Sequence, residues 1–130
     1  MTDVKELRLV LTVPDFDAAL AFYRDALGLD VEAVWSSEGG HVTLLSAGRA
    51  TLELVDDAHA AEIDRLEVGR RVAGPVRVAF EVQDSGGLAD KLVAAGAMRI
   101  AGPVTTPWQD RNVRLEAPDG TQLTLFTPAA

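Results

Sequence analysis

The stretch LRLVLTVPDFDAALAFYRDALGL, residues 7–29, joins the pattern of a strand to the pattern of a helix. Leucine or valine occupies every second position from residue 7 to residue 13, which predicts a strand with one buried face. Pro14 ends this strand, and a helix is predicted to follow. The apolar stripe of that helix consists of Phe16, Leu20, Tyr23 and Leu27. Gly28 is placed to end the helix, because glycine readily adopts the left-handed conformation of a C-terminal cap.

The same pattern returns later in the chain at a constant offset. The stretch VRVAFEVQD, residues 76–84, repeats LRLVLTVPD so that Arg77 corresponds to Arg8 and Val82 corresponds to Val13. A second helix is predicted after it and ends at Gly96. The apolar stripe of this helix consists of Leu88, Leu92 and Ala95.

Each of these openings is followed by three strand-like runs. The runs are residues 31–35, 41–45 and 51–55 in the first half, and residues 98–101, 112–116 and 122–126 in the second. The chain is therefore predicted to be an α+β protein with two βαβββ modules. We expect a single domain over residues 1–130, with one module at about 5–56, a connector at about 57–75 and the other module at about 76–128.

The composition limits the classes of function. Twelve basic and twenty acidic side chains give a formal net charge of −8, which opposes attraction to the phosphates of nucleic acid. No stretch approaches the roughly 20 apolar residues that a membrane-spanning helix needs, and no apolar targeting segment opens the sequence. We therefore expect a cytoplasmic protein with neither nucleic acid nor a membrane as partner. Cysteine is absent, which excludes disulfides, thiolate nucleophiles and cysteine-bound zinc.

The paired modules, with VPDFDAALAFYRDALGL at residues 13–29 and LEAPDGTQLTLFTP at residues 115–128, resemble the vicinal oxygen chelate superfamily. This superfamily includes glyoxalase I, extradiol dioxygenases, fosfomycin-resistance enzymes and bleomycin-resistance proteins. The resemblance covers about residues 5–128. It implies that curved mixed sheets form a cup, and that two chains pair as a homodimer.

In the metal-dependent members, the resemblance implies a divalent cation in the cup, held by the first and last strands of each module. The usual ligands are His or Gln on the first strands and Glu on the last. The matching positions here are Arg8, Glu53, Arg77 and Thr124. A guanidinium stays protonated and has no lone pair for a metal, and one carboxylate would leave the ion bound mainly by water. We therefore expect no metal and no other cofactor.

If alternate leucines and valines pack beneath the helices, the other positions of each strand face the cup. The residues predicted to face inward are Arg8, Val10, Thr12, His41, Thr43, Leu45, Glu53, Arg77, Ala79, Glu81, Asn112, Arg114, Glu116, Gln122, Thr124 and Phe126. Trp108 lies in a loop before a cup strand and is predicted to form the rim, whereas Trp35 is interpreted as core. The predicted ligand-binding residues are Arg8, His41, Glu53, Arg77, Trp108, Arg114 and Thr124, and no catalytic residue is assigned.

Two interpretations of the inward charges stay open. Arg8, Arg77 and Arg114 either bind a ligand or pair with three inward glutamates, in which case the chain is a scaffold whose dimer surface matters most. The glutamates in question are Glu53, Glu81 and Glu116. The leading prediction is a metal-free protein that sequesters a small organic ligand, similar in this respect to bleomycin-resistance proteins. The alternative is an enzyme of the same superfamily, of lyase or dioxygenase type, either metal-free with Glu53 as acid or base or with an atypical metal site.

Overall fold

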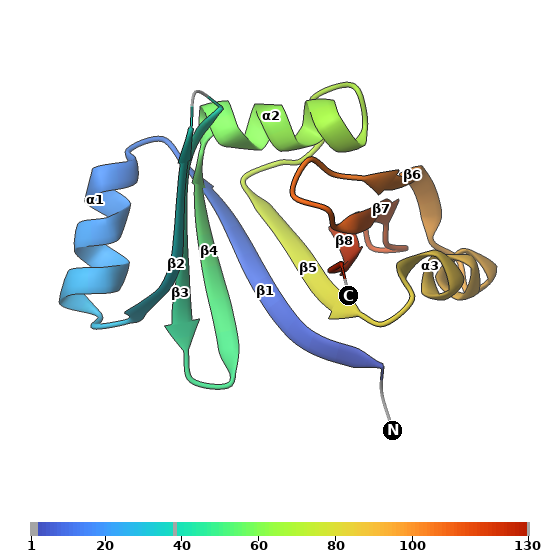
Figure 1. Cartoon of the computed structure of the whole chain (residues 1–130), viewed down its shortest axis with the longest axis horizontal. Coiled ribbons are helices and arrows are strands. Elements are labelled where there is room, and N and C mark those ends of the chain that lie inside the picture. The colour runs from blue at the N-terminus through green and yellow to red at the C-terminus, as the bar shows by residue number, and fades with distance from the viewer. Residues whose placement is uncertain (1–2, 38, 130) are drawn as a thin grey trace.

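The computed structural model describes residues 3–37 and 39–129, and it contains two similar halves joined by a helix (Figure 1). The first half consists of β1 (Val4–Val13), α1 (Phe16–Leu20) with its continuation η1 (Ala21–Ala26), β2 (Asp30–Ser37), β3 (Gly40–Ala47) and β4 (Ala50–Asp56). The second half consists of β5 (Val76–Val82), α3 (Ser85–Ala94), β6 (Met98–Thr105), β7 (Arg111–Glu116) and β8 (Gln122–Thr127). The connector forms α2 (Asp57–Glu67). The predicted α+β fold with two βαβββ modules is confirmed.

The strands form one curved, mixed sheet in the order β2-β3-β4-β1-β5-β8-β7-β6. Within each half the first and last strands run parallel, β1 beside β4 and β5 beside β8. The halves meet where β1 and β5 pair antiparallel, with Arg8 opposite Ala79 and Val10 opposite Arg77. The four strands at the centre of the sheet are therefore the four that carry the positions of the superfamily's metal ligands.

The helices cover the two faces of the sheet differently. On the outer face, α1 and α3 each pack over the leucines and valines of their own half. On the inner face, α2 runs across the opening between the halves (Figure 1), and its Ala60 belongs to one buried apolar cluster with Val10 of β1 and Phe126 of β8. Because α2 spans both halves, it forms a wall of the cup. Among the described residues, no helix is long and apolar enough to cross a membrane.

The first helix departs from the predicted stripe at its C-terminal end. Its last six residues form π-helical turns, in which the Leu27 N–H bonds to the Phe22 carbonyl five residues back at 2.9 Å. A π turn takes up more residues than an α turn, so the side chains beyond it move around the helix axis. Leu27 is therefore 60% exposed, and Leu29 packs on the core in its place.

The predicted inward face of β3 is wrong. A two-residue turn at Gly48 and Arg49 joins β3 to β4, so that each odd-numbered residue of one strand lies opposite an even-numbered residue of the other. Glu53 consequently lies opposite Leu44. The three residues of β3 assigned to the cup, His41, Thr43 and Leu45, instead share the face that packs beneath α1, and Leu45 belongs to the core there.

Candidate ligand-binding site

An open cavity of about 840 Å³ lies on the inner face of the sheet. Its floor comes from the four central strands, with Arg8, Glu53, Arg77 and Thr124 among the lining residues. One wall is α2, which contributes His59 and Leu66 among others, and the rim comes from β2 and the loop at residues 107–110. Sites for drug-sized ligands have volumes of about 300–1,000 Å³, so the cavity has room for an organic molecule.

The four residues at the superfamily's metal positions meet on this floor. Glu53 is 8% exposed and lies between two guanidinium groups, with its Oε1 3.5 Å from Arg8 Nη1 and its Oε2 3.9 Å from Arg77 Nη2. Arg77 Nη1 donates a hydrogen bond to Thr124 Oγ1 at 2.7 Å. The constant offset of the repeat and the parallel pairing within each half thus bring together residues that are far apart in the sequence.

Arg8 has further partners at the edge of the floor. Its Nε lies 2.9 Å from Oε2 of Glu6, and its Nη2 donates to Oε1 of the same carboxylate at 3.2 Å. The guanidinium carbon lies 4.8 Å from the centre of the Phe126 ring, a cation–π distance. Burial acts to lower the pKa of Arg8, but the neighbouring Glu6 and Glu53 carboxylates outweigh it and leave this pKa raised.

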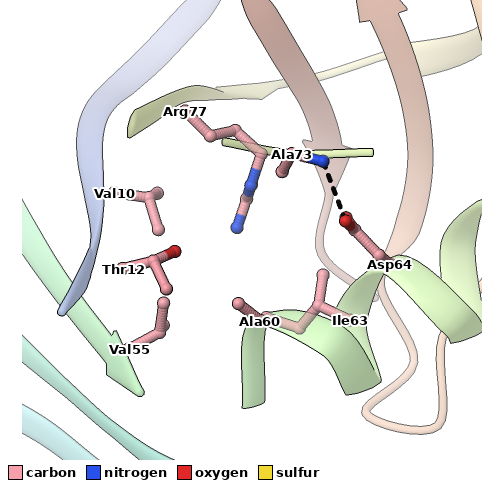
Figure 2. A pocket seen from close by; sticks show the side chains of 8 residues that line it. All are labelled: Val10, Thr12, Val55, Ala60, Ile63, Asp64, Ala73 and Arg77. Carbon is pink, nitrogen blue, oxygen red and sulfur yellow. Dashed lines mark hydrogen bonds between the residues drawn. The ribbon is translucent and has the colours of Figure 1, made fainter. Parts of the chain in front are cut away.

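Arg77 has fewer partners than its burial requires. Its side chain is 9% exposed, and its partners among the described residues are Thr124 and the distant carboxylate of Glu53. Burial, together with the positive charge of Arg114, lowers the pKa of Arg77 below the usual arginine value. Figure 2 shows its guanidinium between Val10 and Thr12 of β1 and Ala60 and Ile63 of α2. These residues line a small space of about 10 Å³, roughly enough for one water molecule.

Arg114 is buried in a different environment. Its side chain is fully buried, with Nη1 2.8 Å from Oδ1 of Asp64 and Nη2 3.0 Å from Oε1 of Glu67, both on α2. Asn112 donates to the other oxygen of Glu67 at 2.9 Å. We call these four residues the α2 clamp. The predicted inward orientation of Arg114 is right, but two carboxylates of the connector hold its terminal nitrogens.

Asp64 extends the α2 clamp into the segment after the helix. Its Oδ2 accepts hydrogen bonds from the backbone N–H groups of Val72 at 2.7 Å and Ala73 at 2.9 Å, and Figure 2 shows the second of these. Arg71 adds an ion pair at 2.9 Å. Burial opposes ionisation of Asp64, but these hydrogen bonds prevail and lower its pKa. Glu81 and Glu116, predicted as partners of the inward arginines, form no ion pair in the described part of the chain.

Of the two histidines, the one that lines the cavity is His59 and not His41, the opposite of the prediction from sequence. The His41 ring lies tilted against Phe16 of α1 with ring centres 5.7 Å apart, and its Nδ1 lies 3.0 Å from Ser36 Oγ. His41 is not among the residues that line the cavity. His59, placed by sequence in the connector, lines the cavity. Burial lowers the pKa of His59, although the negative charges of Glu53 and Asp56 oppose this effect. Its Nδ1 is buried and has no hydrogen-bond partner in the described structure.

A tight loop presents two side chains at the rim. Thr106 N–H donates to the Asp110 carbonyl at 2.8 Å, and Asp110 N–H donates back to Thr106 Oγ1 at 3.1 Å. Gln109 has a φ of 71°, which is uncommon for a residue with a side chain. The loop holds Trp108 at the rim, as predicted, with 46% of its surface exposed. Trp35 also lines the rim and is 48% exposed, so its interpretation as core is wrong.

Asp110 is a cavity residue that sequence reasoning missed. Burial raises the pKa of its carboxyl, and the negative charge of Glu67 acts in the same direction. The nearby Trp108 indole and the charge of Arg8 oppose this effect. His59 and Glu67 were missed as well. The spacing of Asp64 and Glu67, three residues apart on one helical face, was the available signal that α2 presents carboxylates to one neighbour.

The floor does not fit the divalent cation of the metal-dependent relatives. Arg8 and Arg77 are cations that cannot donate a lone pair, and they occupy two of the four positions. Glu53 is shared between them, and Thr124 accepts a hydrogen bond from Arg77. Across residues 3–37 and 39–129, no group of three or more His, Asp or Glu side chains could hold a metal ion.

Comparisons with known proteins agree on the fold. The family model described as Glyoxalase/Bleomycin resistance protein/Dioxygenase superfamily matches residues 7–125. A hypothetical protein from Bacillus halodurans is similar with a TM-score of 0.72 and 16% identity, over 99% of this chain and 97% of that chain. A glyoxalase/bleomycin resistance protein/dioxygenase superfamily member from Vibrio splendidus has a TM-score of 0.64 and 14% identity, over 95% and 98% of the two chains.

A third similar structure is a variant of methylmalonyl-CoA epimerase from Streptomyces coelicolor in complex with 2-nitronate-propionyl-CoA. It has a TM-score of 0.64 and 22% identity, over 99% of both chains. No curated protein matches this chain significantly. At these identities the structural likeness shows the fold alone.

Proposed function

The chain belongs to the Glyoxalase/Bleomycin resistance protein/Dioxygenase superfamily, and we propose that it is a small-molecule-binding member that holds an organic ligand in its cavity without a metal ion. The volume of about 840 Å³ supports a ligand of drug-like size. The two arginines at metal positions support binding without a metal.

Arg77 carries this proposal. A buried guanidinium is costly unless it is paired and hydrogen-bonded, yet among the described residues Arg77 has one hydrogen bond, to Thr124, and one long ion pair of 3.9 Å. It lines the cavity, so a ligand that enters can supply the missing acceptor. A carboxylate or a carbonyl oxygen matches the planar donor fork of arginine.

The rim supports a flat ligand. Trp108 and Trp35 line the same cavity from two different segments, and each is about half exposed. An exposed indole loses apolar contact with water when an aromatic ring stacks on it, a gain of about 0.5–1.5 kcal/mol beyond the area buried. The proposed ligand therefore has a planar apolar part and an acceptor group that reaches Arg77.

A thermal-shift screen of planar organic compounds tests this function, because a ligand that binds only the native state raises the melting temperature. We take 2-naphthoate as the first probe, since it has one aromatic plane and one carboxylate. Its affinity should fall at least about fivefold in Arg77→Met and in Trp108→Ala, given the worth of one charge-assisted hydrogen bond or one aromatic contact. Equal affinity of both folded variants and the wild type contradicts the proposal.

A second candidate function is proton transfer on a bound ligand, with Glu53 as acid or base. His59 favours it, because a second titratable group lines the same cavity and has a buried, unpartnered Nδ1 in the described structure. In this case a C–H hydrogen of the ligand leaves as a proton, and a solvent proton replaces it. Deuterium incorporation into screening hits, followed by NMR and lost in Glu53→Gln, distinguishes this enzyme from a binding protein.

A homodimer is part of the proposal. Leu7 and Leu9 of β1 and Val76 of β5 are exposed on the outer face of the central strand pair, and their fractional exposures range from 37% to 48%. Light scattering should give a mass twice the 13.8 kDa of one chain. A mass near 13.8 kDa at micromolar concentration contradicts the dimer. The cytoplasmic location stays a prediction from sequence.

A further inference from the structure

The carboxylates that line the cavity differ in whether they already have a cation. Glu53 faces Arg8 and Arg77, and Glu62 pairs with Arg65 one turn along α2. Glu67 is held in the α2 clamp by Arg114 and Asn112. Asp110 lines the same cavity, but within residues 3–37 and 39–129 no cation forms an ion pair with it. Asp110 is therefore the cavity carboxylate that is left to face a ligand.

We propose that Asp110 is a second recognition group of the cavity, which accepts a hydrogen bond from a protonated amine or another N–H donor of the ligand. The inference rests on the proposed function and makes the ligand class narrower. The ligand then has an acceptor group for Arg77, a planar apolar part for Trp108, and a donor group for Asp110.

The loop keeps the Asp110 carboxylate at the rim. Two hydrogen bonds connect the backbone of Asp110 to Thr106, and Thr106 is itself only 2% exposed. The Gln109 N–H donates to the Thr106 carbonyl at 2.9 Å, which closes the turn. A backbone that is held in this way need not be ordered when a ligand binds, so the position of Asp110 at the rim is set before binding.

The charges of the cavity favour one orientation of the bound ligand. Arg77 lies on the buried floor and presents a positive charge, whereas Asp110 lies at the partly exposed rim and presents a negative charge. A neutral or purely anionic planar ligand satisfies the floor but offers no N–H donor to Asp110, whose polar neighbours are then the Trp108 indole and the charge of Arg8. A ligand with charges or dipoles of opposite sign at its two ends satisfies both groups at once.

Two naphthalene probes test the inference by isothermal titration calorimetry. The first, 2-naphthoate, has the acceptor group only, and the second, 6-(aminomethyl)-2-naphthoate, adds an ammonium group at the far end of the ring. We expect the second probe to bind the wild type about tenfold more tightly, the usual order for one additional charge-assisted hydrogen bond. Asp110→Asn should remove this advantage, and it should bind the anion 2-naphthoate at least as tightly as the wild type does, because a negative charge is lost from the cavity.

Glu62→Gln is the matched control, since it removes one negative charge from the same cavity at a carboxylate that Arg65 already holds. It should keep most of the tenfold advantage, and circular dichroism should show that both variants are folded. Equal affinity of the two probes for the wild type, or an advantage that persists in Asp110→Asn, overturns the inference. The proposed function survives that result if 2-naphthoate binds the wild type at least about fivefold more tightly than Arg77→Met. If neither probe binds the wild type, the inference and the proposed function both fail.

Discussion

The α2 clamp and the cavity floor each contain a buried arginine, but the two arginines have different partners. Arg114 meets two carboxylates at 2.8 and 3.0 Å, both almost fully buried on α2. Arg77 meets a hydroxyl at 2.7 Å and a shared carboxylate at 3.9 Å. Both residues alternate inward on the strands of the second module. Their roles are therefore set by the partners that the rest of the fold supplies.

The difference separates a cation that supports the fold from a cation that is kept for a ligand. The carboxylates of α2 neutralise Arg114 and tie the connector to β7. Arg77 forms no ion pair with these carboxylates in the described part of the chain, and it lines an open space of about 840 Å³. Removing each arginine in turn should therefore give different losses, one in stability and the other in binding.

The largest expected effect comes from Arg114→Met, which leaves Glu67 buried with no ion-pair partner among the described residues and leaves Asp64 with Arg71 as its remaining ion-pair partner there. Breaking one partner out of a buried ion-pair network costs about 3–5 kcal/mol. Urea denaturation at one fixed protein concentration measures this loss. Arg111→Met is the control, because Arg111 is an exposed residue of the same strand, and its loss should stay within about 0.5 kcal/mol. A loss for Arg114→Met no larger than that of the control contradicts the clamp.

Removing the N-terminal cap of α2 should lower the free energy of unfolding by less than Arg114→Met does. Asp56 caps this helix, with Oδ1 accepting from His59 N–H at 2.8 Å and Oδ2 accepting from His41 N–H at 3.0 Å. Asp56→Ala should destabilise the protein by about 1–2 kcal/mol, the usual worth of an N-cap. The exposed neighbour Asp57 serves as control, because an acidic residue in the first turn contributes only about 0.3–1 kcal/mol through the helix dipole. Equal losses in Asp56→Ala and Asp57→Ala are the result that contradicts this account.

Arg77→Met sharpens the comparison, since the same substitution on the floor should be tolerated. It removes a buried charge whose desolvation is poorly offset, and Glu53 keeps Arg8 at 3.5 Å. We expect the free energy of unfolding to change by less than about 1.5 kcal/mol, well below the effect of Arg114→Met. Urea denaturation of both variants side by side decides this. A loss of the same size at both positions would mean that Arg77 is a structural residue.

The smallest expected effect is a pH dependence from His59. Burial holds the pKa of His59 in the folded state below its ordinary value of 6.5. As the pH falls below 6.5, the unfolded chain gains a proton at this residue before the folded chain does, so stability decreases. Its contribution is under about 1 kcal/mol, because the side chain is partly solvated.

His59→Gln tests the assignment, and its stability should change less between pH 7 and pH 5 than that of the wild type. Asp64, whose folded pKa lies below its ordinary value of 3.8, loses its stabilising contribution only at lower pH, outside this window. If the stability of His59→Gln changes with pH as much as that of the wild type, the pH dependence comes from another group.

The repeat relates Arg8 to Arg77, whereas the resemblance to the superfamily supplied the other two floor positions, Glu53 and Thr124. The constant offset of the repeat relates β1 to β5, and alternation correctly places Arg8 and Arg77 on one face. Alternation failed for β3, because the number of residues in the turn before β4 sets which face His41 occupies. A difference of one residue in a turn exchanges the two faces of a strand.

The repeat could not predict which side chains α2 and the rim loop contribute to the cavity. Glu67 reaches Arg114 from a helix that has no counterpart in the second module, so no offset relates the two residues. Asp110 reaches the cavity through a local turn that depends on a positive φ at Gln109. Such contacts depend on the path of single segments, which neither hydrophobic alternation nor the repeat describes.

The central claim is that two arginines and a shared glutamate occupy the place where metal-dependent relatives hold a cation. Elemental analysis of protein purified without chelators tests this claim most directly, with zinc, nickel, manganese and iron measured against protein concentration. The account predicts far less than one metal ion per chain, with no difference between the wild type and Glu53→Gln. One equivalent of any of these metals in the wild type, lost in Glu53→Gln, would contradict it.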